Sequence, residues 1–81
     1  MKMTRIEAAD IIAKFLAGRG GEWEWDDFTS VPIKGDRELD AIATFSNLVH
    51  DIYPPERPHE YCNDEGKQVL RRIEAYLRRK S

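Results

Sequence analysis

Acidic and aromatic residues are concentrated in one short stretch, and their types point to two different roles. The stretch 22–28, called the acidic aromatic segment below, reads Glu22, Trp23, Glu24, Trp25, Asp26, Asp27 and Phe28. An exposed indole within a ring of negative charge is typical of a hot spot that binds a basic protein. Alternatively, the three aromatic rings complete a core that short helices cannot close alone, and the carboxylates simply face water. Both interpretations hold if each Trp takes one role.

The residues expected to form a protein-binding surface are therefore Glu22, Trp23, Glu24, Asp26 and Asp27. We expect the partner to be another protein with a basic surface, since opposite charge steers association. The segment does not match a calcium loop, which requires alternating oxygen ligands, a central glycine and a distal Glu.

Metal binding through softer ligands is also disfavoured. Zinc normally takes four ligands, and His50, His59 and Cys62 are the imidazole and thiol groups of this chain. They form neither a Cys-x-x-Cys nor a His-x-x-x-His spacing. We expect an exposed His50, a loop His59 and a buried Cys62, with no metal and no cofactor.

Nucleophilic catalysis has weak support in the sequence. Ser46 and His50 are one helical turn apart, but Ser46 falls on the buried side and no orienting acid is evident. Cys62 precedes a helix N-terminus, which would lower a thiol pKa, yet no base stands at a specific spacing from it. We therefore expect no enzymatic activity and predict no catalytic residue.

Basic residues near the C-terminus suggest an alternative function. Arg71, Arg72, Arg78 and Arg79 could neutralise phosphates and so bind nucleic acid. Against this, cations at a helix C-terminus complement its dipole, and the acidic aromatic segment would repel a polyanion. Nucleic acid is thus the less favoured partner.

Three helices are predicted from their caps and apolar periods. The first begins at the capping box Thr4-x-x-Glu7 and stops at Gly18, Gly20 and Gly21. The second begins after the N-cap Asp36 and ends before Pro54. The third begins after Asn63 or Asp64 and continues to the basic C-terminus.

The segment between the first two helices is expected to be irregular or a single helical turn that inserts its aromatic rings between the helices. Its Trp23 and Trp25 alternate with acids as in a strand, but a lone strand would have no partner. The predicted fold is all-α: one domain over 1–81, with three helices packed around Ile12, Leu16, Phe45, Val49, Val69 and Ile73.

Length and composition agree with this picture. A chain of 81 residues suits one small domain, and 41% hydrophobic with 35% charged residues is typical of a folded domain. No apolar run is long enough for a membrane helix or a signal-peptide core. The single cysteine favours a reducing compartment, so we expect a cytoplasmic protein. The oligomeric state is left open.

The motif Gly20-Gly21-x-Trp23-x-Trp25-Asp26-Asp27-Phe28-x-Ser30 resembles a family of short bacterial conserved hypothetical proteins. The similarity continues through Asp36-x-x-Leu39-Asp40-x-Ile42 and Tyr61-Cys62, and it covers most of residues 18–77. It implies a bacterial source and this fold, but no activity, cofactor or catalytic residue.

Overall fold

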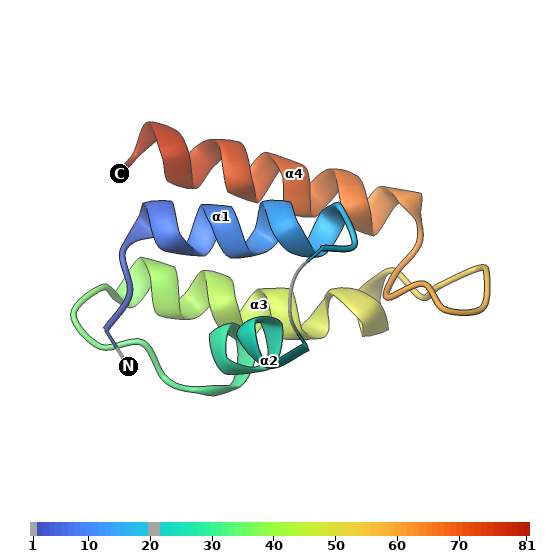
Figure 1. Ribbon diagram of the computed structural model, residues 1–81, viewed down its shortest axis with the longest axis horizontal. Helices are drawn as coiled ribbons and strands as arrows, with labels where there is room; N and C mark the ends of the chain where they lie inside the picture. The colour runs from blue at the N-terminus through green and yellow to red at the C-terminus, as the bar shows by residue number, and fades with distance from the viewer. Residues whose placement is uncertain (1, 20–21) are drawn as a thin grey trace.

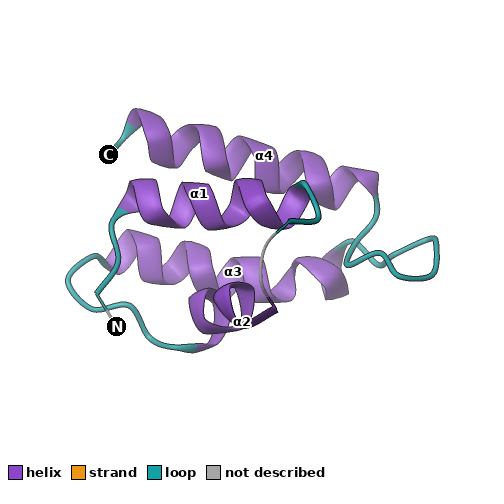
Figure 2. Ribbon diagram, in the orientation of Figure 1, coloured by secondary structure: helices purple, strands orange, loops and turns teal. Residues whose placement is uncertain are grey.

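The computed structural model describes residues 2–19 and 22–81, and within this part all regular structure is helical. The helices are α1 (Arg5–Leu16), α2 (Glu22–Ser30), α3 (Arg37–Ile52) and α4 (Asp64–Arg79) (Figure 1, Figure 2). The predicted all-α class is confirmed. The predicted number of helices is wrong, since the described chain forms four helices where three were expected.

The predicted caps set the boundaries of α1, α3 and α4. The Thr4 hydroxyl accepts a hydrogen bond from the Glu7 amide, and the Glu7 carboxylate accepts one from the Thr4 amide. The side chains of Asp36 and Asn63 accept from the amides three residues on. Gly18 follows α1 with a φ of 70°, a conformation that favours glycine. Gly20 and Gly21, predicted as part of the same stop, lie outside the described residues.

Helix α2 is the element that the sequence did not predict. Trp25, Phe28 and Thr29 are spaced three and four residues apart, and all three are buried. Such spacing defines one face of a helix. The alternation of Trp23 and Trp25 resembled a strand, but residues two apart on a helix point to nearly opposite sides. Helix formation therefore separates the two indoles.

The four helices pack in a ring of neighbours. α1 packs against α4 and α2, α2 packs against α3, and α3 completes the ring by packing against α4. α1 and α4 run antiparallel, as do α3 and α4 (Figure 1). α2 is shorter than the others and lies next to the middle of α3, on the side away from α4 in this view (Figure 2).

The core is formed mainly by buried residues of all four helices. Ile12 and Val49 are fully buried, as predicted, and so is Cys62. The other predicted core residues, Leu16, Phe45, Val69 and Ile73, are partly exposed. They lie toward the edges of the helix faces, whose centres hold the fully buried helix residues Ala8, Ala9, Ile12, Phe28, Leu39, Ser46, Val49, Leu70 and Leu77.

Among the described residues, no helix is both long enough and apolar enough to span a bilayer.

Candidate functional site

The two tryptophans of the acidic aromatic segment have opposite environments. The Trp23 side chain is 75% exposed, whereas Trp25 is 6% exposed. Because both lie on α2, one face of this short helix is anchored in the core and the other is presented to solvent. The two interpretations of the segment therefore apply to different residues.

Trp25 is anchored by other aromatic rings. Its indole stacks on the Phe15 ring with centroids 3.8 Å apart and an angle of 7° between planes. The Tyr61 ring meets both of them edge-on, and Phe28 lies 5.8 Å from Trp25 between ring centroids. The Tyr61 hydroxyl donates to the carbonyl oxygen of Ser46 on α3. This cluster ties α2 to α1, to α3 and to the loop before α4.

The carboxylates of Glu24, Asp26 and Asp27 are exposed and surround the exposed side of α2. None of the three forms an ion pair with another described residue. The side chain of Glu22, which was predicted to join them, lies outside the described part of the structure. The described surface thus holds one indole and three uncompensated carboxylates.

The negative surface extends from α2 onto α1. Glu24 borders a shallow hollow of about 280 Å³ between the two helices, which Glu7, Asp10, Ile11 and Lys14 also line. Asp10 does not pair with Lys14 four residues on; it forms an ion pair with Arg78 of α4, at 3.1 Å. Lys14 and the Asp10–Arg78 pair offset part of the negative charge of this hollow, so Glu7 and Glu24 are the carboxylates that a basic partner would meet there.

The basic residues of α4 do not act as one group. Arg71, Arg72 and Arg79 are exposed and have no ion pair with a described residue. Arg78 contacts both Asp10 and Glu74. Its positive charge is therefore partly neutralised, so three of the four predicted nucleic-acid-binding residues remain available for an anion.

The candidate nucleophiles and metal ligands are dispersed. Ser46 is buried and donates to the Ile42 carbonyl, and His50 contacts the Tyr61 hydroxyl at 3.2 Å. Cys62 is buried, and burial raises the pKa of its thiol, which opposes thiolate formation. His59 is exposed in the loop, with a φ of 71°. No metal-binding group of His, Cys, Asp and Glu is formed by the described residues.

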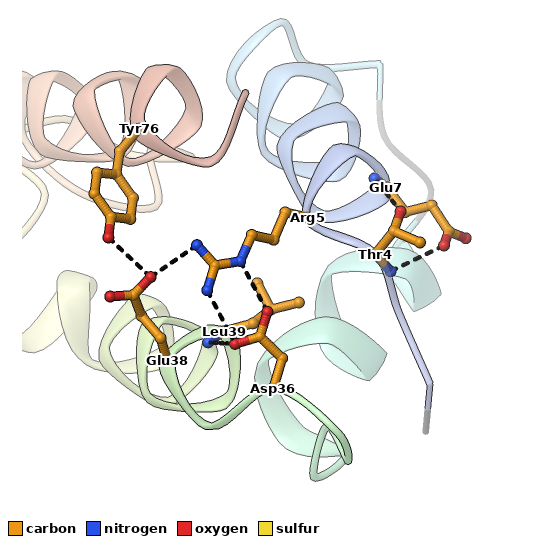
Figure 3. A network of polar contacts seen from close by, with 7 residues as sticks. All are labelled: Thr4, Arg5, Glu7, Asp36, Glu38, Leu39 and Tyr76. Carbon is orange, nitrogen blue, oxygen red and sulfur yellow. Dashed lines mark hydrogen bonds and ion pairs between the residues drawn. The ribbon is translucent and has the colours of Figure 1, made fainter. Parts of the chain in front are cut away.

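A polar network that the sequence did not reveal joins three helices (Figure 3). The Arg5 guanidinium donates from Nε and Nη2 to the two carboxylate oxygens of Asp36, and its Nη1 lies 2.8 Å from Glu38 Oε1. The Tyr76 hydroxyl donates to the same Glu38 oxygen at 2.8 Å. Arg5 lowers the pKa of Asp36 by this hydrogen bonding, while Glu38 raises the pKa of Tyr76. The network fixes the end of the bundle where α1 begins.

Comparison of the chain with protein-family models, with curated proteins and with solved structures found no match.

Proposed function

We propose that this protein is a non-enzymatic, protein-interaction domain of adaptor or immunity type, which binds a basic partner through the solvent face of α2. The supporting observation is the exposure of Trp23, since a large indole left 75% exposed has no role in the core. The bacterial source and the cytoplasmic location suggested by the sequence belong to the same proposal.

The surroundings of Trp23 also favour a basic partner. Glu24 and Asp27 flank it without compensating cations among the described residues, so a partner's Lys or Arg would restore electrostatic balance. The guanidinium of an Arg could also lie on the indole face, an arrangement stabilised by cation–π attraction. Trp25 and Phe28 hold α2 in place, so little order would have to be gained on binding.

A photocrosslinking experiment tests this proposal. Benzoylphenylalanine introduced at position 23 should capture a basic protein from cells, and the capture should fall when Glu24→Lys and Asp27→Lys are added. The matched control carries the crosslinker at Ala75, an exposed position on α4. Equal capture from position 75, or capture that survives both charge reversals, would contradict the proposal.

Tryptophan fluorescence gives a second measurement. In a Trp25→Phe variant the exposed Trp23 is the remaining indole, and iodide should quench its emission freely. Complex formation should shift that emission to shorter wavelength and protect it from iodide, because the partner removes water from the ring. A complex that leaves both the emission and the quenching unchanged would place the binding surface elsewhere.

Nucleic-acid binding through α4 is the second candidate, favoured by the unpaired state of Arg71, Arg72 and Arg79. It requires a gel shift at low salt that weakens as salt rises, because phosphate contacts release counterions. The neutralisation of Arg78 by Asp10 and Glu74 counts against it.

A further inference from the structure

The outer side of the edge between α3 and α4 carries a groove with apolar walls. Two adjoining hollows of about 470 and 330 Å³ share Val69 and Arg72, and together they form what we call the α3–α4 groove. Ile42 and Tyr53 line it from α3 and the residue after it, and Ile73 and Tyr76 line it from α4. The acidic aromatic segment contributes no residue to this surface, so the groove is distinct from the site proposed above.

An exposed apolar side chain of α3 lies on the side of the helix that borders the groove. Ile52 is 51% exposed. At 100° per residue, Ile52 and the half-buried Phe45 lie on the same side of α3 as Glu38 and Ile42, which border the groove. The apolar part of the groove therefore continues onto this side of α3.

The charges on this surface complement each other when the surface meets a copy of itself. Glu65 and Arg72 both line the groove, lie seven residues apart on α4, and are exposed. Neither has an ion pair with a described residue. Val69 and Gln68 lie midway between them. Two antiparallel α4 helices related by a twofold axis near Val69 would place each Glu65 opposite the Arg72 of the other copy.

We propose that a second copy of this chain docks on the α3–α4 groove to form a twofold dimer. A twofold interface requires one patch to carry both partners of every contact, and this patch carries both charges and an apolar centre. Ile52 would be covered at its margin. Two helices of 16 residues present a face of about 24 by 20 Å, on the order of 500 Å² per copy, which is below the standard interface size. We therefore expect a weak dimer that forms at high protein concentration.

Sedimentation equilibrium over a wide concentration range tests the dimer. The apparent mass should rise from 9.4 kDa toward twice that value.

Arg72→Glu and Glu65→Arg, made separately, should each raise the dissociation constant at least about tenfold, because each places like charges opposite one another. The double variant with both exchanges should recover the original dissociation constant, since the pair is then restored with its signs reversed. Arg71→Glu changes the net charge as Arg72→Glu does, but lies outside the groove, and should leave association unchanged.

Ile52→Glu provides a check that does not depend on the ion pair. Because Ile52 is half exposed, the variant should fold, as circular dichroism would verify, and its association should weaken at least about tenfold. A protein that stays monomeric at millimolar concentration overturns the proposal, even if a foreign peptide occupies the groove. A dimer that ignores these substitutions, or that the double exchange does not restore, also overturns it. The state of the Trp23 surface affects none of these outcomes, so this test and the crosslinking test fail independently.

Discussion

Close packing of neighbouring segments limits which side chain fits at some positions of this domain, and Gly66 shows this most clearly. It lies in the first turns of α4, where a β-carbon would come within 2.8 Å of the Cys62 sulfur and 2.9 Å of the Tyr53 β-carbon. Glycine is otherwise a poor choice inside a helix. The close approach of the loop before α4 to the end of α3 accounts for its presence.

Gly66→Ala should therefore destabilise the protein, although the same change inside a helix is ordinarily stabilising. We expect a loss of about 1–3 kcal/mol in the free energy of unfolding, because the neighbouring atoms belong to short side chains with little room to shift. Urea unfolding followed by circular dichroism measures this loss. Gln68→Ala, on the exposed side of α4, is the control and should change stability little. An alanine variant as stable as the parent would show that the loop can move away.

Cys62 should react slowly in the folded protein. Its thiol is buried and its pKa is raised by that burial, so little thiolate is present and reagents cannot reach it. We expect a disulfide reagent at pH 8 to modify Cys62 far faster in urea than in buffer. Equal rates in the two conditions would mean that the loop before α4 opens readily.

The elements of this domain differ in how well local sequence predicts them. The ends of α1, α3 and α4 follow from side chains that cap their own helix, so a short window of sequence contains the cause. The conformation of residues 22–30 depends instead on the packing of the Trp25 ring against Phe15 and Tyr61, which lie outside this segment of the sequence. The acidic aromatic segment could thus be predicted as a candidate surface, but the exposure of Trp23 rather than Trp25 could not. The α3–α4 groove was missed because helix packing decides which face stays uncovered.

Substitutions on the two faces of α2 should separate its structural role from its binding role. Trp23→Ala should change the free energy of unfolding by less than about 0.5 kcal/mol, since the ring is largely in water. Phe28→Leu, at a fully buried position, should cost about 1–2 kcal/mol through lost packing. Chemical denaturation of both variants provides the comparison. A large loss from Trp23→Ala would show that this ring supports the fold.

At the scale of the whole molecule, ion pairs connect elements that are far apart in sequence. Arg5 joins α1 to Asp36 and Glu38, and Arg78 of α4 joins to Asp10 of α1. A more local pair joins Lys67 of α4 to Glu60, in the loop before it. Hydrogen bonds from Arg5 and Lys67 lower the pKa of Asp36 and of Glu60, respectively. A carboxylate whose pKa is lower in the folded state stabilises the fold above its unfolded pKa, near 4, and this stabilisation is lost as the pH falls through the folded pKa.

The protein should therefore lose stability as the pH falls through the unfolded pKa near 4 and on toward the lower folded pKa, because the unfolded chain binds protons there that the folded carboxylates do not. Asp36→Asn should flatten this dependence while keeping a residue able to cap α3. Urea midpoints measured across the pH range test this expectation. Asp26→Asn, on the exposed side of α2, should retain the parent's pH profile. An unchanged profile in Asp36→Asn would exclude the Arg5 contact as a source of acid sensitivity.

The ring of helix contacts has a consequence for the order in which this domain can fold during translation. The most extensive helix contact joins α1 to α4, the first and the last helix of the domain in chain order. All four helices must therefore leave the ribosome before α1 can pack against its main neighbour. Until then much of the apolar side of α1 is uncovered, so the domain folds as a unit rather than helix by helix.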